Sequence, residues 1–304
     1  MSAHESHSHD HSHAPKDFGR AFAIGVALNF GFVVVEVLFG IFAHSLALIA
    51  DAGHNLGDVL GLVLAWVASI LAKTTPTDRR TYGLRSSSIL AALFNAIFLL
   101  VSVGGIVWEA IRRFGIRIEV AGNTVIWVSL VGIAINTVTA LMFFSGRKGD
   151  LNIRSAFLHM AADAAVSAGV VVAGIAIVFT GRHWIDPTVS LIIAVVIVWG
   201  TWGLLRDSVN LALQAVPRGI DLGEVREYLA ALPDVTAVHD LHVWPMSTTQ
   251  TALTVHLEIP IGSPGDAFLQ KVCEHLHHEF GIEHSTIQIE QNAESCALAP
   301  RLAV

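Results

Sequence analysis

Charged residues are scarce in this sequence. They make up 14% of its 304 residues, whereas a soluble domain usually carries about 25%. Hydrophobic residues make up 53% of the chain, and the mean hydropathy is +0.61. The formal net charge is −7, so the chain also lacks the basic excess that neutralises nucleic-acid phosphates. The composition therefore predicts a protein embedded in a lipid bilayer, with no nucleic-acid partner.

Cysteine is scarce as well, with only Cys273 and Cys296 in the chain. This number excludes a disulfide framework and a cysteine-rich zinc fold. The N-terminal segment "MSAHESHSHDHSHAPKD" is polar and has no apolar run before a small-residue cleavage site. No cleavable signal peptide is therefore predicted. Histidine, in contrast, occurs 16 times, which is many for a chain of this length.

Long apolar runs occupy most of the first two thirds of the chain. A transmembrane helix needs about 20 mainly apolar residues, and six stretches meet this requirement: 20–43, 46–72, 86–112, 122–145, 155–180 and 187–206. Lysine and arginine in short loops favour the cytoplasmic side. With a cytoplasmic N-terminus, the inner side would hold Lys16, Arg20, Lys73, Arg79, Arg80, Arg85, Arg147, Lys148, Arg154, Arg206 and Arg218. The outer side would hold Arg112, Arg113, Arg117 and Arg182. This bias predicts that both termini are cytoplasmic.

The pattern changes after residue 207. "DLGEVREYLAALPDV" and "SPGDAFLQKVCEHLHHEFG" have helical periodicity, whereas "VTAVHDLHVWPM", "QTALTVHLEIP" and "STIQIEQ" read as strands. The order αββαβ predicts a small ferredoxin-like α+β domain with helices on one face of a three-stranded sheet. The predicted organisation is a histidine-rich segment at 1–18, a transmembrane bundle of six helices at 19–207 and a cytoplasmic domain at 208–304.

Ionisable residues interrupt two of the apolar stretches. Asp51, His54 and Asp58 share one face of the second stretch, because residues three and four apart on a helix are neighbours. His159 and Asp163 are likewise four apart in the fifth stretch. A charged residue at the centre of a membrane helix costs about 2.5–3.5 kcal/mol on insertion scales, so such residues usually pair or line a functional cavity. Two imidazoles and two carboxylates together suit a tetrahedral divalent metal, above all zinc, and also admit cobalt, iron or cadmium.

An alternative interpretation is a hydrogen-bonded polar cluster that holds the helices together without a metal. The role of Asp51 is also open. It lies one turn nearer the outer end than His54, and it would either orient His54 or form part of the metal exit route. Glu36 shares a face of the first stretch with Asn29, and these two residues would either link helices or line the pathway.

With these residues in view, the chain resembles the cation diffusion facilitator family, and within it the bacterial zinc exporters. The resemblance lies in "SLALIADAGHNLGDVLGLVLA", "LNIRSAFLHMAADAAVSAGVV", "DPTVSLIIAVVIVWGTWGLLRDSVNLAL" and "VHDLHVW…HLEI…IEHSTIQIE", in family order. It implies a homodimer in the bacterial inner membrane, a cytoplasmic metal-binding domain and proton-coupled export. It also implies that His54, Asp58, His159 and Asp163 form the transport site.

Further metal sites are expected outside the membrane. The resemblance implies cytoplasmic zinc ligands at His239, His256, His284 and Glu290, which Cys296 could join; the alternative is a set of surface histidines. Strand alternation places His239 in phase with Leu241 and Val243. The N-terminal histidine tract can chelate metal in an accessory role, and its histidines are His4, His7, His9, His11 and His13.

The predicted mechanism is alternating access. Metal binds neutral imidazole and ionised carboxylate, so metal and protons compete for the same ligands, and an inward proton gradient can drive metal outward. Two other classes remain possible, a membrane-embedded metallohydrolase and a membrane metal sensor. The sequence has no His-Glu-x-x-His and no Gly-x-Ser-x-Gly motif, so a transporter, not an enzyme, is the favoured interpretation.

Overall fold

The computed structural model describes residues 19–144, 151–262, 264–292 and 296. The N-terminal histidine tract therefore lies outside the described residues. Within them, six helices are long and apolar enough to cross a membrane. These helices are α1 (Gly19–Phe42), α2 (Leu46–Ala72), α3 (Ser87–Arg113), α4 (Gly122–Phe143), α5 (Leu151–Thr180) and α6 (Ile185–Ala212). The prediction of a six-helix membrane bundle is confirmed.

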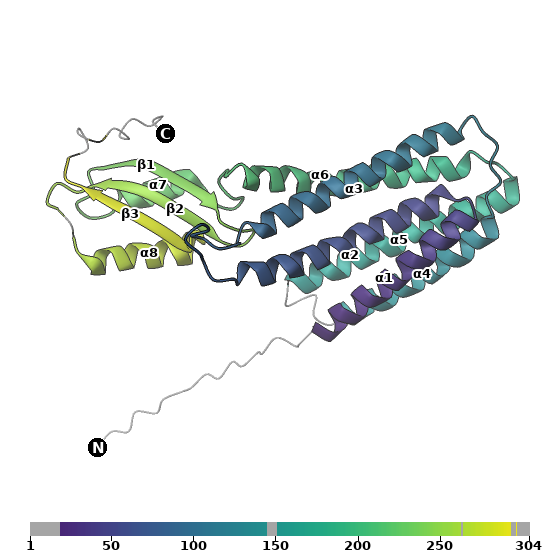
Figure 1. Ribbon diagram of the computed structural model, residues 1–304, viewed down its shortest axis with the longest axis horizontal. Helices are drawn as coiled ribbons and strands as arrows, with labels where there is room; N and C mark the ends of the chain where they lie inside the picture. Colours follow the sequence, from purple (N-terminus) through teal and green to yellow (C-terminus); the bar gives the residue numbers. More distant parts are fainter. Residues whose placement is uncertain (1–18, 145–150, 263, 293–295, 297–304) are drawn as a thin grey trace, which may run out of the picture. The chain divides into compact units, whose positions relative to one another are not determined.

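The chain forms two compact units, and α2, α3 and α6 contribute residues to both. The first unit comprises residues up to 59 and residues 105–194, and in it α4 runs beside both α1 and α5 (Figure 1). Small residues permit this close packing. A Cβ atom on Gly122 would lie 3.1 Å from the carbonyl oxygen of Gly174, and one on Gly174 would lie 3.2 Å from the carbonyl oxygen of Gly122. Reciprocal glycines thus hold α4 and α5 close together.

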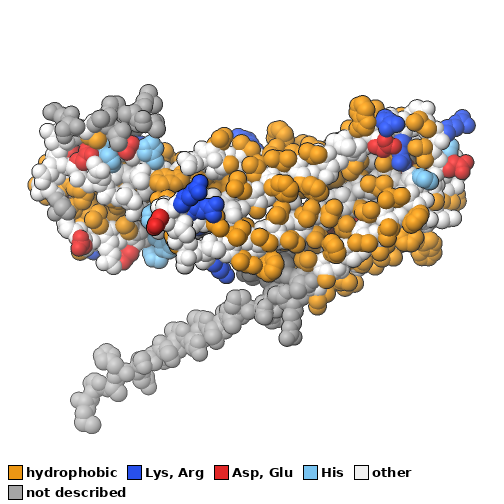
Figure 2. All heavy atoms as spheres, viewed as in Figure 1, with side chains coloured by type: hydrophobic (Ala, Val, Ile, Leu, Met, Phe, Trp, Pro, Cys, Tyr) orange, Lys and Arg blue, Asp and Glu red, His pale blue; other side chains and the backbone are white. Residues whose placement is uncertain are grey.

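Large hydrophobic side chains cover the outside of the long helices. Figure 2 shows them spread over the visible face of these helices, with charged side chains nearly absent between the helix ends. Phe179 of α5 and Trp199 of α6 are each 84% exposed. Such a surface is unfavourable in water but matches the hydrocarbon interior of a bilayer, as expected for an integral membrane protein.

The second unit comprises residues 60–104 and those from 195 onward. Its C-terminal part has the predicted αββαβ order, with α7 (Leu222–Ala230), β1 (Ala237–Pro245), β2 (Thr251–Glu258), α8 (Asp266–Phe280) and β3 (His284–Glu290). The sheet order is β1-β2-β3, with β1 antiparallel and β3 parallel to β2 (Figure 1). The core is formed by side chains of α7, α8, one face of the sheet and the segments that follow β2 and α8: Val225, Leu229, Leu241, Val243, Leu253, Val255, Leu257, Ile259, Val272, Leu276 and Ile282.

A β-bulge in β1 changes which residues face this core. His239 pairs with His256, but the next pair is His242 with Thr254, so β1 has one residue more than β2 in this interval. Asp240 takes up the extra residue with a φ of 47°. Strand alternation predicted His239 in phase with Leu241 and Val243, two residues that the structure places in the core. The bulge instead places His239 opposite His256, on the other face of the sheet.

Candidate metal sites

The first candidate site lies between α2 and α5, in the first unit. Each helix supplies one histidine and one aspartate a single turn apart, and the structure brings all four together. His54 Nε2 is 3.3 Å from Asp163 Oδ1 and 3.7 Å from Asp58 Oδ2. His159 Nε2 is 3.2 Å from Asp58 Oδ2 and 3.7 Å from Asp163 Oδ2. Each imidazole therefore lies near both carboxylates.

Burial within this four-residue cluster is uneven. The side chain of Asp163 is 2% exposed, those of His54 and Asp58 are 21% and 25% exposed, and that of His159 is 41% exposed. The ligand atoms of His54, Asp58 and Asp163 all lie within 4.8 Å of one another. Three ligands are thus assembled in the interior, and His159 is the ligand whose side chain is the most exposed.

Several polar atoms of this cluster are buried and have no hydrogen-bond partner among residues 19–144, 151–262, 264–292 and 296. They include Oδ2 of Asp58, Oδ2 of Asp163 and Nδ1 of His54. Leaving such atoms unpaired in an apolar interior is costly. A bound divalent cation would satisfy the carboxylate oxygens, and so would protonation of the facing imidazoles. The cluster therefore suits alternate occupation by a metal and by protons.

Asp51 does not join this cluster. Its side chain is fully buried, and its Oδ2 accepts a hydrogen bond of 3.1 Å from Ser167 Oγ on α5. It lies beside Glu36 of α1, whose Oε2 accepts a hydrogen bond of 2.9 Å from Asn55 Nδ2. Sequence periodicity placed Asp51 and His54 on one face but gave no indication that α1 supplies a second carboxyl group there.

The second candidate site lies on the sheet of the second unit, on the face opposite the hydrophobic core. His239 Nε2 is 3.1 Å from Glu290 Oε2, and His256 Nδ1 is 3.0 Å from Glu290 Oε1. Cys296 Sγ is 3.7 Å from His256 Nδ1. The ligand atoms of these four residues lie within 4.8 Å of one another. Thiolate, imidazole and carboxylate are all ligands that zinc accepts, so the donor set fits this metal.

The charge state of Glu290 also suits a cation site. Burial raises the pKa of this carboxyl, but hydrogen bonds from Cys296 and Gln288 and the charges of His239 and His256 lower it more. The resulting pKa lies below the ordinary value for glutamate. Glu290 is therefore ionised at neutral pH and can act as an anionic ligand.

His284 is not brought to this group, although it was predicted with it. It pairs with Ala252, four positions along β2 from His256, which is about 13 Å at the strand rise of about 3.3 Å per residue. Its ring instead packs edge-to-face against Tyr82, with centroids 5.6 Å apart. Sharing a strand face with Glu290 was not sufficient, because the two residues lie near opposite ends of β3.

Two further residues of this region lie outside the four ligands that the resemblance implies, although Cys296 was considered as an additional ligand. Cys296 follows β3 by six residues, and a cysteine beside a predicted His and Glu ligand set is the only sequence signal that could have placed it there. Asp240 has Oδ1 2.9 Å from His242 Nε2 and Oδ2 3.4 Å from His256 Nε2. Asp240 is in phase with His242, on the face of the sheet opposite the core residues Leu241 and Val243, and this is the face that His256 occupies.

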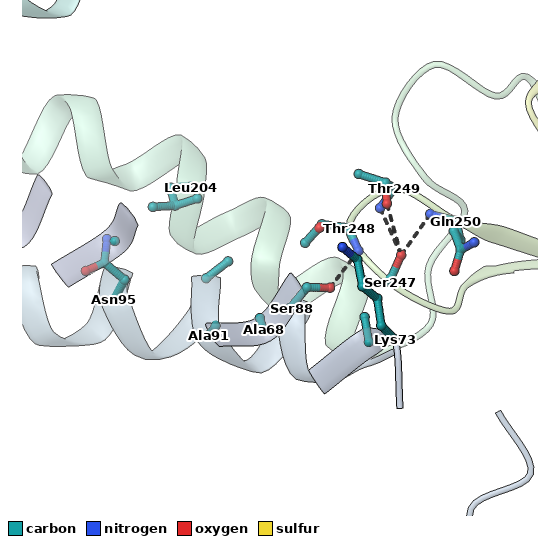
Figure 3. Close-up of a pocket in the computed structure, with 13 residues that line it drawn as sticks. Ala68, Lys73, Ser88, Ala91, Asn95, Leu204, Ser247, Thr248, Thr249 and Gln250 are labelled. Atoms are coloured by element: carbon teal, nitrogen blue, oxygen red, sulfur yellow. Dashed lines mark hydrogen bonds between the residues drawn. The ribbon is translucent and has the colours of Figure 1, made fainter. Parts of the chain in front are cut away.

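The second unit also contains a cavity of about 570 Å³ between α2, α3, α6 and the β1–β2 loop (Figure 3). The loop is tied to α3 because the Thr248 backbone N–H donates a hydrogen bond of 3.0 Å to Ser88 Oγ. Ser247 Oγ accepts from the backbone N–H of Gln250 at 2.9 Å, which closes the turn. The lining residues include no His, Cys, Asp or Glu, so this cavity offers no ligand set for zinc.

Comparison with known families covers both parts of the chain. A model described as "Cation efflux transmembrane domain" matches residues 22–211. A second model, "Cation efflux protein, cytoplasmic domain", matches residues 217–292. The first match covers the six long helices, and the second covers the αββαβ part that follows them.

Whole-length relatives agree with these matches. The chain is 36% identical to "Cation efflux system protein CzcD" of Alcaligenes sp. (strain CT14), over 93% of this chain and 89% of the relative. It is 36% identical to "Zinc transporter ZitB" of Escherichia coli (strain K12), over 94% and 92%. It is 31% identical to "Cadmium, cobalt and zinc/H(+)-K(+) antiporter" of Bacillus subtilis (strain 168), over 94% and 93%. On these grounds the chain belongs to the cation efflux family, the cation diffusion facilitators that its motifs resemble.

Proposed function

We propose that this protein exports divalent metal ions, zinc above all, from the cytoplasm in exchange for protons. One observation carries the proposal: the two His-x-x-x-Asp pairs of α2 and α5 converge on a single cluster in which each imidazole Nε2 lies 3.2–3.7 Å from both carboxylates. His54, Asp58, His159 and Asp163 would replace the hydration shell of the ion. The metal is the transported substrate, and the membrane-embedded ligands are its temporary site.

The ligand set favours zinc over hard cations. Two imidazole nitrogens and two carboxylate oxygens suit tetrahedral zinc, whereas magnesium and calcium prefer six or more oxygen ligands. The same set also admits cobalt and cadmium. The names of the relatives agree with this range, since one is called a zinc transporter and another a cadmium, cobalt and zinc antiporter.

Proton exchange follows from the same contacts. With no metal, a proton on either imidazole creates a cation 3.2–3.7 Å from both carboxylates, which stabilises the empty site. Arriving metal requires neutral imidazoles and displaces these protons. Histidine is suited to this exchange because its reference pKa of about 6.5 lies near physiological pH. An inward proton gradient would therefore drive metal outward by alternating access.

The assembly proposed is a homodimer in the bacterial inner membrane, with both termini cytoplasmic. The lysine and arginine distribution supports this orientation, and the match of residues 217–292 to the family's cytoplasmic domain supports the placement of the αββαβ part. The histidine-rich segment at 1–18 would capture metal in an accessory role. The bundle at 19–207 would transport the metal, and the domain at 208–304 would mediate metal-dependent dimerisation.

Zinc flux coupled to opposite proton flux tests the transport proposal. In inside-out vesicles containing the purified protein, zinc added outside is expected to enter the lumen and make it alkaline, and an acid lumen should accelerate entry. Cadmium and cobalt should give smaller responses, and magnesium and calcium none. Fluorescent metal and pH indicators measure both fluxes. Zinc entry with no proton movement would contradict antiport, and no entry at all would favour the sensor or hydrolase interpretation.

The cytoplasmic cluster is proposed to hold a resident zinc ion on His239, His256, Glu290 and Cys296, where the metal would cross-link β1, β2 and the C-terminal segment. Replacing Cys296 by serine in the full-length protein is expected to weaken zinc binding at this site by at least about 10-fold. Zinc-dependent thermal stabilisation, measured in an Asp163→Asn background that silences the transport site, provides the readout. Cys273→Ser is the matched control and should leave the stabilisation unchanged. Equal stabilisation in both variants would remove Cys296 from the site.

A further inference from the structure

A second pair of acidic groups is buried in the first unit, beside the four-residue cluster. Glu36 of α1 and Asp51 of α2 each have 0% of their surface exposed. Each carboxyl group has one donor from a neighbouring helix: Asn55 Nδ2 donates to Glu36 Oε2 at 2.9 Å, and Ser167 Oγ donates to Asp51 Oδ2 at 3.1 Å. These bonds fix the orientation of both carboxyl groups.

The remaining oxygens of this pair have no hydrogen-bond donor within the part of the chain that the structure describes. Oε1 of Glu36 and Oδ1 of Asp51 are buried without a hydrogen-bond partner among the described residues. Glu36 is bonded to Asn55, one helical turn along α2 from Asp51, so its carboxyl group lies beside the face of α2 that carries Asp51. Two ionised carboxylates that share a site away from water repel each other strongly, and a single proton between them removes the repulsion. Two buried and neighbouring carboxyl groups therefore favour a proton shared between them.

The surroundings of the pair connect it to the metal cluster. Asp51 and Ser167 each lie one helical turn from a cluster residue, His54 on α2 and Asp163 on α5. In the proposed topology, Asp51 lies nearer the outer side than His54 on α2, and Ser167 lies nearer the outer side than Asp163 on α5. His54 and Asp163 act electrostatically on Asp51, and Asp163 also acts on Glu36. Helix α4, which packs against α1 and α5, has no ionisable side chain between Gly122 and Phe143.

We propose that Glu36 and Asp51 form a proton-binding site on the outer side of the metal cluster, and that its protonation alternates with occupation of the cluster by metal. The inference rests on the proposed antiport function. A divalent ion on the cluster favours ionisation of the pair, and departure of the ion favours protonation. The proton is taken from the outer side and held as an O–H···O hydrogen bond between the two carboxyl groups. It is released toward the cytoplasm when the next metal ion enters the cluster, and no other bond is made or broken. The pair would thereby supply part of the proton exchange.

The test compares Glu36→Gln and Asp51→Asn with the wild type in proteoliposomes. Both variants keep the shape and remove the exchangeable proton. Zinc-for-zinc exchange without a pH gradient is expected to continue, whereas the number of protons moved per zinc should fall by about one, and the dependence of zinc uptake on lumenal pH should weaken. Glu36→Asp should restore part of the proton movement. Ser190→Ala serves as the control, because this buried hydroxyl donates its hydrogen bond to the Asp186 carbonyl of its own helix.

Three outcomes would overturn either the proton site or the antiport function. In the first, the wild type couples zinc flux to proton flux and both neutral variants show the same proton movement and pH dependence. That result would overturn the pair as a proton site and leave the antiport proposal intact. No zinc-linked proton movement in the wild type would overturn the antiport proposal itself. Loss of zinc binding in the folded variants would show that Glu36 or Asp51 is a metal ligand, and it would overturn their assignment as a proton site.

A second measurement uses the wild-type protein alone. Infrared difference spectra at neutral pH should contain the carbonyl band of a protonated carboxyl group, and this band should decrease when zinc is added. Absence of the band would overturn the proposal even if the neutral variants do not fold.

Discussion

Asp163→Asn is expected to abolish zinc transport in proteoliposomes while leaving the helical fold intact. Asp163 is 2% exposed and lies within 3.7 Å of both imidazoles, so it is the more deeply buried of the two carboxylates that a cation would meet. Asparagine has nearly the same shape but no charge. Loss of even an outer hydrogen-bond partner of a metal ligand typically costs 10–100-fold in affinity or activity. Loss of a charged ligand should therefore reduce zinc flux by more than about 100-fold.

His54→Ala provides an independent test from the other helix. It removes the imidazole that lies 3.3 Å from Asp163, so the same loss of flux is expected. Ser190→Ala, which removes a buried hydroxyl distant in sequence from the ligands, should transport zinc at the wild-type rate. Circular dichroism and size-exclusion elution establish that each variant is folded. Full zinc flux in folded Asp163→Asn or His54→Ala protein would contradict the assignment of the transport site.

Asp186→Ala is expected to lower the free energy of unfolding by about 3–5 kcal/mol, the range for breaking a buried charged contact. Asp186 lies in the first turn of α6 and is 1% exposed. It accepts hydrogen bonds from Ser45 Oγ at 2.6 Å and from the backbone N–H groups of Leu46 and Ala47 at 2.8 and 3.3 Å. An aspartate of α6 thus caps the N-terminus of α2, where unsatisfied N–H groups and the helix dipole favour an anion.

The measurement is the thermal unfolding midpoint in detergent, with Asp221→Ala as the control. Asp221 caps α7 through backbone N–H groups of Gly223 and Glu224, but it does so at the surface. An exposed cap of this kind is worth about 1 kcal/mol, so its loss should lower the midpoint much less. Asp186→Asn keeps an acceptor oxygen and should fall between the two. Equal shifts for Asp186→Ala and Asp221→Ala would show that the buried contact stabilises no more than an ordinary cap.

The helix-borne part of the candidate transport site was predictable because an α-helix has a fixed period. His54 and Asp58, and likewise His159 and Asp163, are four residues apart, so each pair shares a face whatever surrounds it. The cost of ionisable groups in a membrane then argues that the two faces meet. No comparable argument located Glu36 beside Asp51, because the rotation of α1 against α2 depends on packing between helices.

The strand-borne site was less predictable. Alternation along β1 is regular only when no residue is inserted, and the bulge at Asp240 moved His239 to the face that His256 and Glu290 occupy. Alternation also carries no information about position along a strand, so His284 and Glu290 share a phase yet lie far apart.

The sequence by itself determined the membrane class, the six spans, the αββαβ order and two ligand-bearing helix faces. It did so because hydropathy and local periodicity depend on neighbouring residues. The tertiary structure alone decided that α1 contributes a carboxyl group beside Asp51, that Cys296 returns to His256, and that Asp186 caps a helix 140 residues earlier. These contacts join segments distant in the chain, and they arise from packing geometry that no local pattern encodes.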